Sequence, residues 1–257
     1  MPTLSPVRGV LLDLDGTLYQ GGAALPGAAE AVRGLRASVG VRFLTNTTSR
    51  SREAVRERLA DVGIEAALEE ILSPPAIAGD WLRDAGASAA LFLPEAAHAD
   101  FAGVDTEADR PEWVVVGDLG PAWDFATLNR AFRLLMSGAR LLALGRTRYW
   151  RAPDGLRLDT GPFVAALEAA TGQTARVVGK PDPAFFRAGC AGLGLPAEAC
   201  AVVGDDAESD VRAAIRAGLR GVLVQTGKYR PGDEDGDPAP DVLAPSIAAV
   251  PAALGLA

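Results

Sequence analysis

A short apolar run near the N-terminus ends in two aspartates, and this feature restricts the fold more than any other part of the chain. Gly9 to Leu12 are apolar, and Asp13-Leu14-Asp15-Gly16-Thr17 follows directly. An apolar run of this length, bounded by a turn residue, is typical of a strand covered on both faces in a parallel sheet. The i, i+2 spacing puts both carboxylates on one side of an extended backbone, and the glycine lets the chain turn away. We therefore predict a buried parallel strand that carries two carboxylates at its carboxyl end.

Two carboxylates at the tip of a buried strand repel each other. At about 4 Å and an effective dielectric constant near 20, the repulsion is on the order of 4 kcal/mol. Such a pair needs a bound proton or a cation to offset that repulsion. The pair Asp13 and Asp15 therefore indicates a metal site. Taken alone, the motif also fits two aspartates that cap a turn.

The composition excludes several classes of function. The net charge of −8 and the pI near 4.8 oppose nonspecific binding to nucleic acid or to an anionic membrane. We find neither a membrane-spanning apolar run nor a signal pattern, so we expect a cytoplasmic protein. Cys190 and Cys200 form no C-x-x-C motif and His98 is the only histidine, which argues against thiolate or imidazole metal sites.

Strand and helix patterns alternate along the chain. The helix expected at 124–137 has Asp124 as its cap and Phe125, Leu128, Phe132 and Leu135 facing inward. The alternation predicts an α/β fold with a parallel sheet and right-handed crossovers. Strands are expected at 9–13, 41–45, 89–93, 113–116, 140–144, 175–178, 200–204 and 221–224, a hairpin at 149–158, and helices at about 26–38, 77–83, 124–137, 161–171 and 184–192.

Polar residues follow several of these strands at the point where each strand ends. In an open parallel sheet, ligands bind outside the carboxyl ends of the strands, so residues far apart in sequence should meet in one crevice. The residues concerned are Asp13 with Asp15, Thr45 with Asn46, Lys180, and Asp205 with Asp206.

The types of these residues fit one reaction. Aspartates are hard oxygen ligands that suit Mg²⁺. Lys180 and the Thr45 hydroxyl can neutralise and orient phosphoryl oxygens. An ionised aspartate is a nucleophile that needs no base at neutral pH, and a second, protonated carboxyl can donate to the leaving oxygen and then accept from water. The residues therefore favour phosphoryl transfer.

These motifs resemble those of the haloacid dehalogenase superfamily. The four motifs are Asp13-Leu14-Asp15-Gly16-Thr17, Thr45-Asn46, Gly179-Lys180-Pro181, and Gly204-Asp205-Asp206 with Asp210. Three longer segments resemble those of subclass IIA, the NagD-like group. They are Phe43-Leu44-Thr45-Asn46-Thr47-Thr48, Val177-Val178-Gly179-Lys180-Pro181 and Gln225-Thr226-Gly227-Lys228-Tyr229-Arg230. The resemblance implies a Rossmann-like parallel-sheet core with a large inserted α/β cap domain of the C2 type.

The resemblance also implies a role for each motif residue. Asp13 would be the nucleophile that forms an aspartyl-phosphate, and Asp15 the general acid and base. Thr45, Asn46 and Lys180 would bind the substrate phosphate. Mg²⁺ would be held by the Asp13 carboxylate, the Asp15 main-chain carbonyl and Asp205, with Asp206 or Asp210 in the outer shell. Two members of this subclass that the chain resembles carry serine at the position of Asp15, so their substrate preferences need not transfer.

The cap also follows from the length of the chain between two motifs. Between Thr45 and Lys180 lie 134 residues, far more than the dozen or so that a crossover needs. We expect a core made of residues 1–76 and 177–257 and a cap made of residues 77–176, which would close over the crevice and exclude water. Similar proteins form homodimers through the cap. Candidate substrate contacts in the cap are Arg146, Arg148, Tyr149, Arg151, Asp159 and Thr160, although charged turns are also common as plain solvated hairpins.

The sequence therefore predicts a Mg²⁺-dependent phosphatase acting on small phosphorylated metabolites. The alternative is a catalytically weak phosphate-binding or regulatory protein on the same fold. A signalling receiver module would be much shorter and would lack the inserted cap. Dinucleotide binding is disfavoured because the first strand does not lead into a Gly-x-Gly-x-x-Gly turn.

Overall fold

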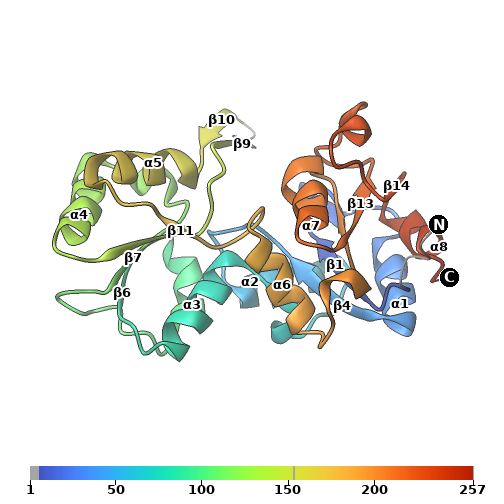
Figure 1. The fold of residues 1–257 in the computed structure, drawn as a ribbon, viewed down its shortest axis with the longest axis horizontal. Coiled ribbons are helices and arrows are strands. Elements are labelled where there is room, and N and C mark those ends of the chain that lie inside the picture. Colours follow the sequence, from blue (N-terminus) through green and yellow to red (C-terminus); the bar gives the residue numbers. More distant parts are fainter. Residues whose placement is uncertain (1–5, 153, 257) are drawn as a thin grey trace. The chain divides into compact units, whose positions relative to one another are not determined.

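The computed structural model describes residues 6–152 and 154–256, which fold into two compact units (Figure 1). The first unit consists of the described residues up to Thr45, of Val55–Leu72 and of the described residues from Lys180 onward. The second unit consists of Asn46–Ala54 and Ser73–Gly179. The second unit is thus inserted in the sequence of the first. The domain boundaries expected from the sequence, 1–76, 77–176 and 177–257, remain a proposal.

A six-stranded sheet forms the centre of the first unit, and all of its strands are parallel. The strand order is β14-β13-β12-β1-β4-β5, so β1 lies between β4, the next strand of this sheet along the chain, and β12, which is distant in sequence. This arrangement confirms the predicted α/β class. The strands are β1 (Gly9–Asp13), β4 (Gly40–Leu44), β5 (Ile71–Leu72), β12 (Cys200–Gly204), β13 (Arg220–Val224) and β14 (Val242–Ala244), with a separate hairpin of β2 (Tyr19–Gln20) and β3 (Ala23–Ala24).

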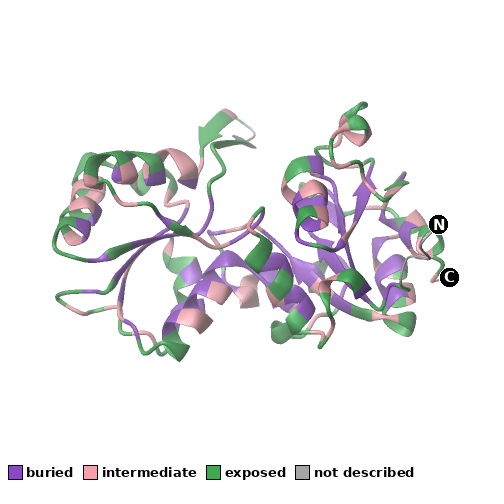
Figure 2. Cartoon of the chain, in the orientation of Figure 1, coloured by how far each residue is buried: buried purple, intermediate pink, exposed green. Residues whose placement is uncertain are grey.

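Helices cover both faces of this sheet, which explains why β1 and β12 are buried at every residue (Figure 2). Val10 and Leu12 pack in one cluster with the apolar side chains of α1 and α8. Leu11 lies on the opposite face, where its side chain contacts α6 at Gly189. A strand covered on both faces needs apolar side chains on both faces, hence the continuous run. The helices are α1 (Ala28–Ser38), α2 (Arg52–Asp61), α6 (Pro183–Ala191), α7 (Ala213–Arg216) and α8 (Val250–Ala253).

The second unit has a parallel sheet of four strands in the order β11-β8-β7-β6. Two separate apolar clusters cover its two faces, one including α3 and the other including α4 and α5. The strands are β6 (Ala89–Phe92), β7 (Trp113–Val116), β8 (Arg140–Ala143) and β11 (Arg176–Val177), the hairpin is β9 (Tyr149–Ala152) with β10 (Gly155–Leu158), and the helices are α3 (Pro74–Asp84), α4 (Phe125–Met136) and α5 (Thr160–Thr171).

Polar side chains cap several of these helices, as the sequence indicated for α4. The Asp124 carboxylate accepts a hydrogen bond from the main-chain N–H of Thr127 at 2.7 Å, so the predicted cap is confirmed. Ser73, Asp159 and Asp182 cap α3, α5 and α6 in the same way. Each cap pairs one N–H group that the helix itself cannot satisfy.

The prediction that Phe125 of α4 faces the core is wrong. Phe125 is 83% exposed, whereas Leu135 is buried and Leu128 and Phe132 are half-buried against the same cluster. Periodicity assigns a residue to a face of a helix, but it cannot tell at which residue the helix begins to cover its sheet.

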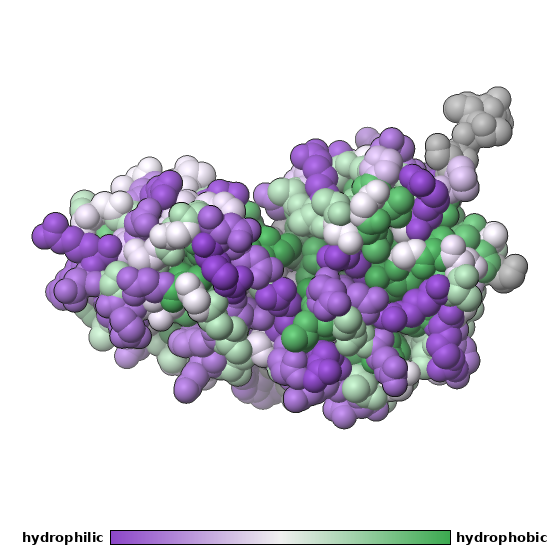
Figure 3. Space-filling view, turned by 90° about the horizontal axis from the view of Figure 1, so that it is seen from below, coloured by the Kyte–Doolittle hydropathy of each residue, from purple (hydrophilic) through white to green (hydrophobic). Residues whose placement is uncertain are grey.

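The surface mixes hydrophilic and hydrophobic residues on the face that Figure 3 presents. Among the described residues, four of the large exposed hydrophobic side chains belong to the β9–β10 hairpin, namely Tyr149, Trp150, Leu156 and Leu158. This hairpin is therefore more apolar than a plain solvated turn. Within the described ranges, no helix has the length and apolar character that crossing a bilayer requires.

Candidate active site

Three buried aspartates of the first unit lie together at the carboxyl ends of β1 and β12. Oxygen atoms of Asp13, Asp205 and Asp210 lie within 4.8 Å of one another. The strand register explains the proximity, because Leu12 pairs with Val203; Asp13 is the last residue of β1, and Asp205 directly follows the adjacent strand β12. The structure therefore brings together aspartates that the sequence places almost 200 residues apart.

Lys180 supplies a positive charge inside this cluster. Its ammonium group pairs with Asp13 Oδ1, and it lies 2.7 Å from Asp210 Oδ1. The Lys180 side chain is 3% exposed, so the pairs are shielded from solvent. Thr17 was not predicted as a site residue, although it lies in the first motif; its hydroxyl donates to Asp13 Oδ2 at 3.2 Å. Both oxygens of the Asp13 carboxylate are thus held in a defined orientation.

The surroundings shift the pKa values of this group. Burial raises the pKa of Asp205 to about 7, and the charges of Asp13 and Asp210 act in the same direction. Burial also raises the pKa of Asp210 to about 6, against the opposing effect of Lys180. Burial alone would lower the pKa of Lys180, but the neighbouring carboxylates outweigh it and raise that pKa. The cluster therefore holds more negative charge than one lysine balances.

The donor set fits a divalent cation. When ionised, the three aspartates and Lys180 carry a net charge of −2, which one divalent ion would balance. All three aspartates offer hard oxygen ligands, which suit Mg²⁺ or Ca²⁺ better than a thiophilic metal. The residues present thus fit the metal that the sequence motifs imply.

The loop after β12 separates the roles of Asp206 and Asp210. The Asp206 carboxylate accepts hydrogen bonds from the main-chain N–H groups of Glu208 and Ser209, at 3.1 and 2.9 Å. It thereby begins a π-helix over Ala207–Arg212. That helix returns Asp210 to the strand end, where its Oδ2 accepts from the Asp206 N–H at 3.3 Å. Of the two outer-shell candidates, Asp210 is the one that lies in the carboxylate cluster.

Asp15 and Thr45 also belong to the first unit. Asp15 is exposed, two residues beyond the buried Asp13. Thr45 is 4% exposed and directly follows β4, whose last residue Leu44 pairs with Asp13. The carboxyl ends of β1, β4 and β12 therefore lie side by side in the sheet, as the sequence predicted.

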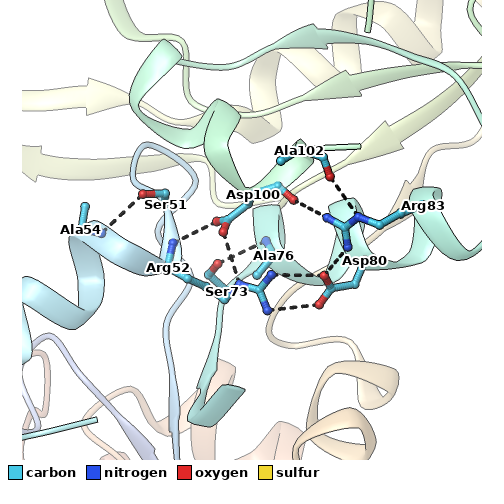
Figure 4. A network of polar contacts seen from close by, with 9 residues as sticks. All are labelled: Ser51, Arg52, Ala54, Ser73, Ala76, Asp80, Arg83, Asp100 and Ala102. Carbon is cyan, nitrogen blue, oxygen red and sulfur yellow. Dashed lines mark hydrogen bonds and ion pairs between the residues drawn. The ribbon is translucent and has the colours of Figure 1, made fainter. Parts of the chain in front are cut away.

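Asn46 belongs to the second unit, in a segment that a network of charges holds there (Figure 4). Arg52, the first residue of α2, donates from its main-chain N–H to Asp100 Oδ2 at 3.0 Å and from Nε to Asp100 Oδ1 at 3.2 Å. Its two terminal nitrogens donate to Asp80 at 3.2 and 3.1 Å. A carboxylate at a helix N-terminus is favourable, because the helix dipole is positive there. The network fixes segment 46–54 to α3 and to the helical turns at 95–101, and the sequence contained no signal for it.

The residues that the sequence suggests as substrate contacts in the cap domain have different surroundings within the second unit. Arg146 forms a two-point pair with Glu168, so its guanidinium is already bound by a carboxylate. The Asp159 carboxylate caps α5 at Thr160. Tyr149 is 52% exposed, and the guanidinium of Arg148 lies 6.0 Å from the centre of its ring. The side chain of Arg151 lies outside the described residues. A role in specificity remains a prediction for each of these residues.

A doubly covered parallel sheet with an aspartate cluster at its carboxyl edge and an inserted α/β unit defines a class of hydrolytic enzymes. Family models match the chain at both ends, one described as haloacid dehalogenase-like hydrolase over residues 10–107 and one as HAD-hydrolase-like over 177–250. The chain belongs to the haloacid dehalogenase superfamily, in its NagD-like subclass IIA.

Relatives of known sequence and structure cover nearly the whole chain. It is 43% identical to haloacid dehalogenase-like hydrolase domain-containing protein 2 of Bos taurus, over 93% of both chains. It is 39% identical to the human phospholysine phosphohistidine inorganic pyrophosphate phosphatase, over 90% of this chain and 87% of that one. The solved p-nitrophenyl phosphatase of Archaeoglobus fulgidus matches with a TM-score of 0.88 and 29% identity, over 95% of this chain and 97% of that one. The chain is thus an enzyme of the hydrolase type, with phosphatases among its relatives.

Proposed function

We propose that this protein is a Mg²⁺-dependent phosphatase that hydrolyses small phosphorylated metabolites through an aspartyl-phosphate intermediate. The observation that carries the proposal is the buried group of Asp13, Asp205 and Asp210 with Lys180 at the edge of the sheet. The relatives support it, because one is named a phosphatase of phospholysine, phosphohistidine and inorganic pyrophosphate and another a p-nitrophenyl phosphatase.

In the first step, a carboxylate oxygen of Asp13 attacks the phosphorus atom, and the bond from phosphorus to the leaving oxygen breaks. The Thr17 hydroxyl and the Lys180 ammonium hold the Asp13 carboxylate in one orientation, so little reorganisation precedes the attack. Asp15, in its protonated form, donates a proton to the leaving oxygen. The products of this step are the free alcohol and a phosphorylated Asp13.

In the second step, water attacks the phosphorus atom of phosphorylated Asp13. The Asp15 carboxylate accepts the proton of that water, and the bond between phosphorus and the Asp13 oxygen breaks. Inorganic phosphate leaves and both aspartates return to their starting states. Lys180, Thr45 and Asn46 are proposed to bind the phosphoryl oxygens.

A cation at this site would be held by the carboxylates of Asp13 and Asp205 and by the main-chain carbonyl of Asp15, with Asp210 in the outer shell. When bound, Mg²⁺ would neutralise the charge of the phosphoryl oxygens. The second unit is proposed to act as the lid that selects the leaving group, with Arg148 and Tyr149 as candidate contacts. Dimerisation through this unit and a cytoplasmic location stay predictions.

Hydrolysis of 4-nitrophenyl phosphate tests the proposed function. We expect turnover with Mg²⁺, loss of turnover after addition of excess EDTA, and recovery when excess Mg²⁺ is restored, because the carboxylate cluster lacks a balancing charge without the ion. Release of nitrophenolate, followed by absorbance, is the measurement. A protein that binds Mg²⁺ and phosphate but releases no nitrophenolate would instead be a phosphate-binding or regulatory protein.

Mg²⁺ affinity should depend on pH around neutrality. The pKa of Asp205 is raised to about 7, so this carboxyl is largely protonated below that pH, and the ion must displace the proton. We expect the affinity to fall as the pH falls below 7, by up to about tenfold per pH unit for one displaced proton. Calorimetric titration at about pH 6 and about pH 8 measures the effect. Equal affinities at the two pH values would contradict this prediction.

A further inference from the structure

A segment after β13 lies directly against the aspartate cluster, although none of the four superfamily motifs includes it. The Thr226 hydroxyl donates a hydrogen bond to the main-chain carbonyl of Gly16 at 2.6 Å, across 210 positions of sequence. Two residues later, the main-chain N–H of Lys228 donates to Asp205 Oδ2 at 2.7 Å. Residues 226–228 therefore contact both the turn after Asp15 and one of the clustered carboxylates.

Two glycines allow this close approach. Gly16 and Gly227 both have positive φ angles, of 87° and 59°, which side chains disfavour. A Cβ atom at Gly227 would lie 1.9 Å from Asp205 Oδ2 and 2.6 Å from the Cα atom of Gly16. A Cβ atom at Gly16 would lie 2.1 Å from the same carboxylate oxygen. The Asp205 carboxylate is thus enclosed between two backbone segments that only glycine can form.

We propose that Thr226 is a positioning residue for the cation site. Its hydroxyl ties the Asp15–Gly16 turn to the segment whose Lys228 N–H orients the Asp205 carboxylate. One contact would therefore align two of the proposed cation ligands, the Asp15 carbonyl and Asp205. This inference rests on the proposed function, because it assigns Thr226 a role toward the divalent ion of that site.

The role predicts a defect in Mg²⁺ affinity that excess Mg²⁺ overcomes. Loss of a hydrogen bond that orients metal ligands typically lowers metal affinity about 10- to 100-fold. Thr226 also contacts the turn that carries Asp15, the proposed general acid, so Mg²⁺ affinity and not turnover is the readout. If Thr226 had only a structural role, its replacement would lower the melting temperature by the same amount with and without Mg²⁺.

Three variants of the full chain test the proposal. Thr226→Val keeps the shape of the side chain and removes the donor, whereas Thr226→Ser keeps the hydroxyl. Thr171→Val is the matched control, because the Thr171 hydroxyl also donates to a main-chain carbonyl, that of Leu167 at 2.7 Å, but in the second unit. Mg²⁺ affinity is measured by calorimetry, and the melting temperature is measured with Mg²⁺ and with EDTA. Should Thr226→Val not fold, Thr226→Ala takes its place, since it adds no new atoms.

We expect Thr226→Val to weaken Mg²⁺ binding at least about tenfold, with Thr226→Ser and Thr171→Val close to the unmodified protein. The rise in melting temperature on adding limiting Mg²⁺ should shrink for Thr226→Val alone. An affinity for Thr226→Val or Thr226→Ala within about twofold of the unmodified protein overturns the inference, as does an equal loss in Thr171→Val. If the unmodified protein itself binds no Mg²⁺, the proposed function fails, and this result is distinct from a failure of the inference.

Discussion

Asp13→Asn is expected to lower phosphatase turnover at least about a thousandfold while the protein stays folded. The amide has nearly the same shape as the carboxylate, but it is a poor nucleophile and carries no charge. It can still accept a hydrogen bond from Thr17, whose hydroxyl donates to Asp13 Oδ2 at 3.2 Å. The initial rate of nitrophenolate release at saturating Mg²⁺ measures the loss, and circular dichroism checks the fold.

Asp84→Asn is the matched control for this variant. Asp84 is an exposed residue at the end of α3 in the second unit, so its replacement should leave turnover unchanged. A second readout distinguishes a lost nucleophile from a general defect. The unmodified protein is mixed briefly with substrate labelled in its phosphoryl group and is then quenched with acid. Label should stay on the unmodified protein, and none should stay on Asp13→Asn. Turnover by Asp13→Asn at the rate of the unmodified protein would refute the assigned nucleophile.

Lys180→Met is expected to reduce both stability and turnover. Lys180 is a buried cation between two buried carboxylates, and methionine of similar length leaves them without this positively charged partner. Removing one member of a buried ion pair typically costs about 3–5 kcal/mol. We therefore expect a loss of that size in the free energy of unfolding, measured with urea in EDTA near pH 7.

The loss in Lys180→Met should depend on pH. Burial already raises the pKa of Asp205 to about 7 and of Asp210 to about 6, so the folded state takes up protons that the unfolded chain lacks at the same pH. Lys180 opposes the rise in the pKa of Asp210, so its removal lets Asp210 take up a proton at higher pH. The loss in the free energy of unfolding should therefore shrink as the pH falls from about 8 toward 6. A loss in stability that does not change over this range would contradict the explanation.

Lys228→Met is the matched control, because the chain has only two lysines. The Lys228 side chain is 69% exposed and lies 3.2 Å from Asp206 Oδ2. Exposed pairs contribute little, so we expect a change below about 1 kcal/mol in the free energy of unfolding. Equal losses in the two lysine variants would show that burial between the aspartates is not the cause.

The ends of the strands could be predicted because they depend only on neighbouring residues in the sequence. Each parallel strand reads as a short apolar run, and its carboxyl end is the polar residue that follows, as with Asp13, Thr45 and Asp205. All strands of a parallel sheet end at one edge, so the grouping followed without coordinates. The sequence also indicated the inserted unit, from the long interval between Thr45 and Lys180.

Other features depended on how a helix begins or on contacts between distant segments. The sequence left Asp206 and Asp210 as equal candidates, because both follow β12 closely; the π-helix over Ala207–Arg212 separates them. The periodicity predicts an inward-facing Phe125, yet this residue is exposed at the first turn of α4.

The sequence by itself determined the fold class, the residue types of the site and the chemistry that those types permit, since these depend on local patterns and on side-chain pKa values. Only the tertiary structure decided which groups touch. The contact of Thr226 with Gly16 spans 210 positions, and the pairing of Arg52 with Asp80 and Asp100 joins segments of the second unit that follow different strands. Such contacts arise from the packing of whole elements, and no local spacing of residues encodes them.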